Sequence, residues 1–177
     1  MRFLPALVAM SLLTACAGYH VGYVKPTAMK NVRRICVKNF KNDTLEPRVE
    51  VLLANAVIRQ LHADGTYEVT DEAHADAILK GTLTGIERVP ARGLTGNVLQ
   101  TTEYLLTLRC NYRLADAKSD RVLDQRAVQG ATSFFVSGGS AGQSIQTADS
   151  NRDERQALPL AAEDLAVRIT SLVSEGW

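Results

Sequence analysis

The stretch Tyr104-Leu105-Leu106-Thr107-Leu108-Arg109-Cys110-Asn111-Tyr112-Arg113-Leu114 decides how the rest of the chain is organised. Its even-numbered residues are all apolar or aromatic, whereas most of its odd-numbered residues are polar. Because successive side chains of a strand point to opposite faces, this period of two predicts a long strand. One face of that strand is expected to lie on a core and the other to face water or a partner.

Strands are also predicted on both sides of this stretch. Residues 77–89 alternate small or apolar side chains with polar ones, and residues 121–136 do so more weakly. Residues 91–100 lie between the first two strands, are mostly polar and contain two glycines, so we expect a hairpin loop there. Residues 115–120 are expected to form the turn between the second and third strands.

The segment 32–70 is predicted to form a strand, a helix and a second short strand. Residues 32–40 are rich in β-branched and aromatic side chains, and residues 67–70 are a shorter run of the same kind. The helix between them is expected to end at Gly65, and residues 42–44 (Asn-Asp-Thr) are suited to cap its start. Its apolar positions recur every three or four residues: Val49, Leu52, Leu53, Ala56, Val57 and Leu61.

A second amphipathic helix is predicted from about Asn151 to the end of the chain, after a Gly- and Ser-rich loop over residues 137–150. Pro159 lacks a backbone donor, so the helix either starts near Pro159 or bends there. Its apolar stripe comprises Leu158, Ala161, Ala162, Leu165, Ile169, Leu172 and Val173.

This order of elements predicts one α+β domain over residues 32–177, preceded by a leader over residues 16–31. We expect two amphipathic helices packed on one face of a mixed, mostly antiparallel four-stranded sheet. Cys36 and Cys110 fall within predicted strands, and the pattern favours buried free thiols over a disulfide bridge between them. The sequence alone leaves both states open, because a bridge depends on geometry.

Residues 1–15 have the layout of a secretory signal peptide: Arg2 is followed by an apolar run much shorter than the roughly 20 residues that span a bilayer. The following Leu13-Thr14-Ala15-Cys16 resembles the lipobox of bacterial lipoproteins. The resemblance implies that Cys16 becomes the N-terminus and carries acyl chains such as palmitate. Ala17 stands where an aspartate would retain a lipoprotein in the inner membrane, so we expect an outer-membrane anchor that faces the periplasm. The alternative is an ordinary signal peptide with a chance cysteine at its end.

Composition and motifs exclude several classes of protein. Removal of Arg2 with the signal peptide takes the net charge from +1 to zero, and no basic block is present, so no nucleic-acid partner is expected. With 46% hydrophobic and 22% charged residues, the chain has the composition of a folded domain. The three histidines lie far apart, so no catalytic centre, metal site or cofactor is predicted. Asp71, Glu72 and Asp76 are interpreted as a solvated turn.

Several short motifs occur in a characteristic order behind the signal peptide. They are Cys16-Ala17-Gly18-Tyr19-His20, the strand–helix unit 32–62, Thr102-Glu103-Tyr104, Ser133-Phe134-Phe135 and the closing helix. In this order the chain resembles the LptE family of lipopolysaccharide-assembly lipoproteins. The resemblance implies a periplasmic lipoprotein that plugs the large β-barrel LptD and helps lipopolysaccharide to reach the outer leaflet. The fold that it implies agrees with the prediction from periodicity.

Two other functions fit the same architecture. One is a pilotin-like lipoprotein that escorts another outer-membrane pore, and the other is a periplasmic lipid carrier. A carrier needs an apolar cavity large enough for acyl chains, whereas a plug is expected to be solidly packed.

Three arginines are candidates for lipopolysaccharide binding, because a polyanionic ligand favours the guanidinium group. Arg92 lies in the predicted hairpin loop, where the resemblance implies a basic residue at the loop tip. Arg109 and Arg113 lie on the non-core face of the central strand, about 13 Å apart at 3.3 Å per residue. The alternative is that the three arginines are solvated or paired with carboxylates such as Glu103.

Overall fold

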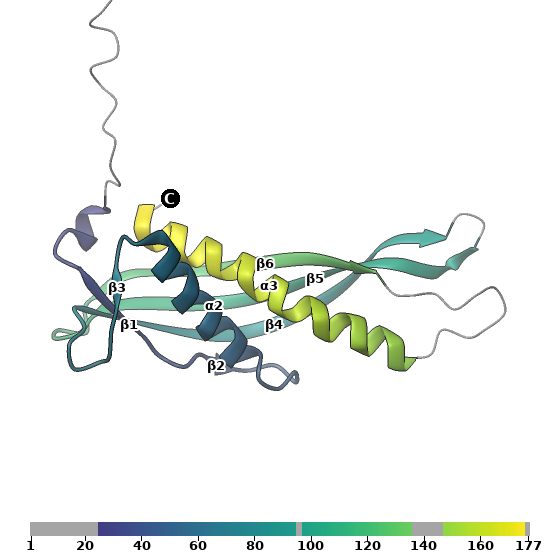
Figure 1. Cartoon of the computed structure of the whole chain (residues 1–177), viewed down its shortest axis with the longest axis horizontal. Helices are drawn as coiled ribbons and strands as arrows, with labels where there is room; N and C mark the ends of the chain where they lie inside the picture. The colour runs from purple at the N-terminus through teal and green to yellow at the C-terminus, as the bar shows by residue number, and fades with distance from the viewer. Residues whose placement is uncertain (1–24, 95–96, 136–146, 176–177) are drawn as a thin grey trace, which may run out of the picture.

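The computed structural model describes residues 25–94, 97–135 and 147–175. Its central element is strand β5 (Asn97–Asp116), which pairs antiparallel with β4 (Ala77–Leu94) and with β6 (Val122–Phe135). Helices α2 (Val49–Asp64) and α3 (Thr147–Glu175) lie side by side on one face of this sheet (Figure 1). The predicted α+β class and the placement of both helices on one face are confirmed.

The predicted count of four strands is wrong, because the sheet has six strands among the described residues. Three short strands complete it: β1 (Arg34–Val37), β2 (Lys41–Asn42) and β3 (Glu68–Val69). The order is β3-β1-β4-β5-β6, with β2 paired to β4 further along, and every pair that β1 or β2 makes is parallel. The sheet is therefore mixed, because α2 carries the chain from β1 back to a parallel neighbour.

The predicted bounds of the hairpin loop, residues 91–100, are also wrong. Strand β4 continues to Leu94 and β5 begins at Asn97, so Arg92 lies in a strand and not at a loop tip. The pairing there passes through register shifts between Pro90 and Leu94. These irregularities accommodate residues that disfavour regular strands, and the hairpin extends beyond both helices (Figure 1).

The start of α2 differs from its prediction. The N-cap is Arg48, which has a left-handed backbone and provides no side-chain cap, whereas Asn42 binds Thr44 within the preceding loop. The predicted stop is confirmed, since Gly65 has a φ of 73° and donates its amide to the Leu61 carbonyl. Of the predicted apolar stripe, all positions are buried except Leu52, which is 36% exposed.

Helix α3 begins at Thr147, four residues before the predicted start, so residues 147–150 of the predicted loop belong to the helix. Residues 137–146 of that loop lie outside the described residues. Pro159 lies well inside the helix, so the alternative that the helix starts near Pro159 is wrong. Its predicted apolar stripe faces the core, with Leu172 at the partly buried edge.

The core lies between these two helices and the even-numbered side chains of β5. Leu106, Leu108, Cys110, Tyr112 and Leu114 are all buried, which confirms the predicted alternation. Cys36 and Cys110 are free buried thiols, which confirms the favoured alternative, and burial raises the pKa of Cys110 to about 12.

Strand β6 pairs only with β5 among the described residues, so its other edge is open. At one point α3 closes that edge: the Asp164 carboxylate accepts the Ala131 amide N–H at 2.9 Å and also binds Arg168. A backbone donor that has no strand partner is thereby satisfied.

The signal peptide over residues 1–15, with Cys16, lies outside the described residues. The end of the predicted leader is described, and it packs onto the domain. Met29 in the short 3-10 helix η2 (Thr27–Met29) is buried in the core, and the Lys25 ammonium lies 4.4 Å from the centre of the Tyr67 ring. No helix in the described part of the chain is long and apolar enough to cross a membrane.

Candidate functional site

The candidate site is the face of β4, β5 and β6 that points away from the helices, which we call the open face. On β5 it carries the odd-numbered side chains from Glu103 to Arg113, because the even-numbered ones point into the core. The cross-strand register continues this face onto both neighbouring strands. None of the described helices packs on it.

All three predicted arginines lie on or beside the open face, and each is paired with a carboxylate. Arg92 Nε lies 3.4 Å from Glu103 Oε2, its direct cross-strand neighbour. Arg109 pairs with Glu87. Arg113 Nη1 lies 2.9 Å from Asp120 Oδ1. The pairing with carboxylates that the sequence left open is therefore present.

The structure does not gather these arginines into one cluster. Arg92 lies opposite Glu103, ten residues along β5 from Arg113, which corresponds to about 33 Å at 3.3 Å per residue. Arg109 lies between them. The three cations form a row along the strand, so one phosphate group cannot contact all of them.

The row is held more firmly at the Arg113 end. A side-chain hydrogen bond from Arg113, followed by its charge, lowers the pKa of Asp120, and the same hydrogen bond raises the pKa of Arg113. Arg92 makes a longer contact, and its side chain is 79% exposed. The Arg92 side chain is therefore the most accessible of the three to an external anion, although its partner Glu103 is only 16% exposed.

An apolar group on the open face was missed from the sequence. Val89 is the cross-strand partner of Leu105, and Phe135 pairs with Glu103 one position further along the same face. All three apolar side chains are exposed, Phe135 by 66%. The available signal was Leu105, the one apolar residue at an odd-numbered position of the stretch 104–114.

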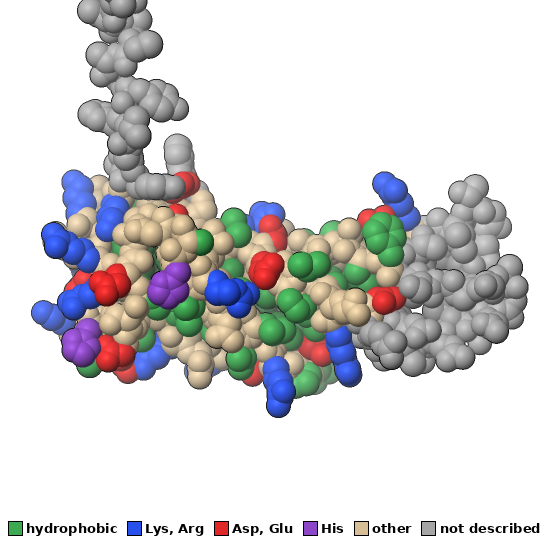
Figure 2. Space-filling view, in the orientation of Figure 1, with side chains coloured by type: hydrophobic (Ala, Val, Ile, Leu, Met, Phe, Trp, Pro, Cys, Tyr) green, Lys and Arg blue, Asp and Glu red, His purple; other side chains and the backbone are tan. Residues whose placement is uncertain are grey.

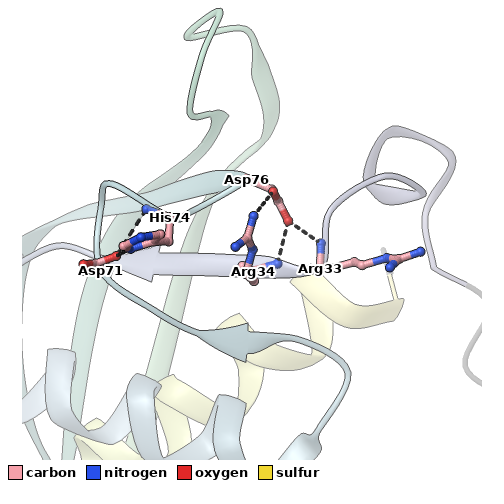
Figure 3. Close-up of polar contacts among 5 residues, drawn as sticks. All are labelled: Arg33, Arg34, Asp71, His74 and Asp76. Atoms are coloured by element: carbon pink, nitrogen blue, oxygen red, sulfur yellow. Dashed lines mark hydrogen bonds and ion pairs between the residues drawn. The ribbon is translucent and has the colours of Figure 1, made fainter.

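Asp76, directly before β4, binds the start of β1 in a contact that we call the Asp76 latch (Figure 3). The Asp76 carboxylate accepts the amide of Arg34 at 2.9 Å, the amide of Arg33 at 3.1 Å and the Arg34 guanidinium at 3.2 Å. Asp71 pairs instead with His74, at 2.6 Å. Among the described residues, no group of three or more His, Cys, Asp and Glu side chains is placed to hold a metal ion.

Replacing Asp76 with asparagine is expected to lower the free energy of unfolding by about 1 kcal/mol at pH 7, because one oxygen and the charge are lost. Burial acts to raise the pKa of Asp76, but the hydrogen bonds from Arg34 and Arg33 outweigh it, so the pKa lies below its ordinary value. The carboxylate therefore stabilises the fold above the unfolded pKa of about 3.9, and this contribution is lost as pH falls through the lowered pKa.

Denaturant unfolding at several pH values measures this difference between wild type and Asp76→Asn. Asp71→Asn is the matched control, because that carboxylate is exposed and bonded only locally; its effect at pH 7 is expected to stay within about 0.5 kcal/mol. A difference for Asp76→Asn that persists undiminished at the acid end would contradict the latch.

The open face thus combines a row of paired cations with an apolar group at the far end of a long hairpin. A model of the LptE family, described as lipopolysaccharide-assembly, matches residues 32–172. The chain belongs to the LptE family. The match covers both helices almost completely and all six strands.

Solved structures show the same fold at low identity. Protein XCC0632 from Xanthomonas campestris has a TM-score of 0.52 at 14% identity, over 89% of this chain and 94% of that one. A minor lipoprotein from Acinetobacter baumannii has a TM-score of 0.50 at 20% identity, over 82% and 94%. PelC from Paraburkholderia phytofirmans, solved as a dodecamer, has a TM-score of 0.50 at 17% identity, over 85% and 94%. No curated protein matches the chain significantly.

LptE membership makes this chain a member of a lipopolysaccharide-assembly family. The structural neighbours add the fold alone, because their identities are too low to transfer a ligand or a partner. Lipoprotein processing, the barrel partner and the contacts with lipopolysaccharide therefore require their own arguments.

Proposed function

We propose that this LptE-family protein is an outer-membrane lipoprotein, anchored through Cys16 and facing the periplasm. In this proposal it joins a large LptD-like β-barrel and helps to deliver lipopolysaccharide to the outer leaflet. The observation that carries the proposal is the LptE match over residues 32–172, which extends across nearly the whole folded domain.

The shape of the domain supports a role inside a wide pore. Strand β5 alone has 20 residues, which span about 65 Å at 3.3 Å per residue. The β4–β5 hairpin continues past the helices as a narrow extension (Figure 1). Barrels of about 16–18 strands leave only a channel, so a barrel that admits this domain needs well over 20 strands.

The open face supports contact with lipopolysaccharide, which combines acyl chains with phosphate groups. Val89, Leu105 and Phe135 offer an apolar surface for acyl chains, with Arg92 and Arg109 close to it on the same face. Phosphate is a good ligand for guanidinium, and the side chains of Arg92 and Arg109 are both more than half exposed, so an external phosphate can reach them. We assign Arg92 and Arg109 to this contact, and Arg113 to the end of the same row.

Purification of the full-length lipoprotein from outer membranes tests the proposed partner. A large barrel is expected to remain bound in mild detergent together with lipopolysaccharide. A secretin-type pore in its place would support the pilotin alternative. Recovery of lipopolysaccharide with no barrel would support the lipid carrier, and either result would overturn the plug.

Replacing Arg92 with aspartate is expected to weaken lipopolysaccharide binding at low salt by roughly fivefold or more, because a cation facing the ligand becomes an anion beside Glu103. The salt dependence of binding should also become shallower. Titrations at two ionic strengths, with the fold checked by circular dichroism, measure both effects.

Arg59→Asp is the matched control for this change. Arg59 is an exposed arginine whose guanidinium lies 3.4 Å from a glutamate, Glu163, so it resembles Arg92 in its pairing but lies on the helix-bearing side. The control makes the same change in net charge and is expected to bind like wild type. Equal losses in the two variants would remove Arg92 from the site.

A further inference from the structure

A pocket lies on the open face, far from Arg92 and the apolar group. It has a volume of about 350 Å³ and extends across four strands, from the β1–β2 connection to β6. The described residues that line it include four cations and several amides or hydroxyls, but no Asp or Glu. The side chains used in the argument are Lys38, Lys41, Lys80, Asn111, Arg113 and Gln125.

Strand register places the cations around a single hollow. Lys80 and Arg113 are direct cross-strand partners on β4 and β5. Lys41 on β2 pairs with Thr82, one strand away and two residues along from Lys80. With strands about 4.8 Å apart and a rise of about 3.3 Å per residue, the Lys41 and Lys80 backbones are about 8 Å apart. Phe40 is buried against Gly81 on the core face, so Lys41 points to the open face.

The charges in this pocket are only partly balanced. Lys38 pairs with Glu72 and Arg113 pairs with Asp120, but neither Lys41 nor Lys80 forms an ion pair with any described residue. Like charges directly opposite on neighbouring strands destabilise a sheet, and Asp120 offsets part of the repulsion between Lys80 and Arg113. The pKa of Asp120 is lowered by the hydrogen bond and charge of Arg113 and further by the charge of Lys80. Four cations against the carboxylates of Glu72 and Asp120 still leave an excess of positive charge, which an anion in the pocket would balance.

The lining suits a phosphate group in particular. Lysine ammonium groups bind phosphate as point charges, and the Asn111 and Gln125 amides add neutral donors for the remaining oxygens. Thr82 and Asn111 are short side chains on adjacent strands, so the middle of the pocket stays hollow. Its volume is several times that of phosphate, which leaves room for an attached alcohol group.

The location of the pocket points to a source of such groups. The described chain begins at the β1–β3 end of the molecule, where Lys and Arg side chains gather at the left of Figure 2. If Cys16 is the anchor, as proposed above, eight residues lie between it and Lys25, and the nine steps along the chain span at most about 30 Å at about 3.5 Å per step. Anionic lipid head groups of the anchoring membrane therefore lie within range of this end.

We propose that the pocket formed by Lys38, Lys41, Lys80 and Arg113 binds the phosphate group of an anionic lipid head group, with Lys41 and Lys80 as its principal ligands. This site shares Arg113 with the end of the arginine row, but its principal ligands, Lys41 and Lys80, lie away from the lipopolysaccharide contact at Arg92. Only the choice of a membrane lipid as the source rests on the proposed anchor at Cys16; the pocket and its charges do not.

The test follows backbone amide chemical shifts of the full lipoprotein in neutral detergent. The titrants are inorganic phosphate, dihexanoyl phosphatidylglycerol and zwitterionic dihexanoyl phosphatidylcholine at constant ionic strength. Shifts are expected at Lys41, Lys80 and Asn111 with phosphatidylglycerol and not with phosphatidylcholine. In Lys41→Gln/Lys80→Gln the affinity is expected to fall at least about fivefold, the loss of two exposed charge contacts.

Lys30→Gln/Lys118→Gln is the matched control, because it removes two exposed lysines that do not line the pocket and changes the net charge equally. It is expected to bind phosphatidylglycerol like wild type. Equal losses in both double variants, or shifts spread over all surface lysines, would overturn the site. Inorganic phosphate binding as tightly as phosphatidylglycerol would keep the phosphate site and overturn the head-group source. Titrating the same variants with lipopolysaccharide tests the two proposals separately, because the proposed function depends on Arg92 and not on Lys41 or Lys80.

Discussion

Replacing Leu165 with aspartate is expected to unfold the domain. Leu165 is fully buried at the centre of the α3 stripe. Removing a buried leucine side chain costs about 2–5 kcal/mol, and an unpaired carboxylate placed there costs several kcal/mol more. Since domains of this size are stable by about 5–15 kcal/mol, the substitution removes most or all of the stability. Far-UV circular dichroism and thermal unfolding measure the effect.

Leu160→Asp provides the control on the same helix, five residues away. Leu160 is 54% exposed, so aspartate at this position remains hydrated. Its unfolding midpoint is expected to stay within a few degrees of wild type, since surface changes lie within about 0.5 kcal/mol. If Leu165→Asp unfolds no earlier than Leu160→Asp, the packing face of α3 is assigned incorrectly.

Replacing Gly130 with alanine is expected to destabilise the domain by about 2–3 kcal/mol, which lowers the unfolding midpoint by about 5–10 °C. A Cβ at position 130 would lie 2.4 Å from the Leu165 backbone nitrogen and 2.6 Å from its Cα. Backbone atoms of a packed helix cannot rotate away as a flexible side chain can. Helix α3 must therefore move off β6, or the sheet must bend.

Gly85→Ala is the control in the same sheet, in strand β4 on the other side of β5, because a Cβ there meets no heavy atom within 4 Å. It is expected to leave stability unchanged or to raise it slightly, since alanine restricts the unfolded chain. A thermal midpoint for Gly130→Ala equal to that of Gly85→Ala would show that α3 and β6 do not make this close contact. Both glycines alternate with larger residues in the sequence, so only the structure distinguishes them.

Periodicity predicted the parts of the fold in which a single element carries its own signal. The alternation around Leu108 and the stripe around Leu165 each extend over several turns or residue pairs, and both are confirmed. Strands β2 and β3 have two residues each, which is too short for a period, and their parallel pairing depends on where α2 returns the chain. The hairpin itself was predicted, but its loop was predicted too long, because cross-strand pairing continues through Gly93 and Asn97 despite their turn preference.

The candidate sites were harder to predict, because they form across strands. Arg92 and Arg109 could be selected by residue type, but their carboxylate partners depend on a register with a shift at Thr84 that no local pattern reveals. Lys41 and Lys80 come together with Arg113 through pairing between segments far apart in the sequence. From the sequence alone, Lys41 and Lys80 look like ordinary surface lysines.

The bond between Asp164 and the Ala131 amide also affects how copies of this molecule meet one another. An open strand of fourteen residues would otherwise be a template for a strand from another copy and so for aggregation. A strand approaching β6 must first displace a carboxylate and then bury that charge beside its own backbone carbonyls. Helix α3, which completes the core, thus also hinders the addition of a further strand at this point of the β6 edge.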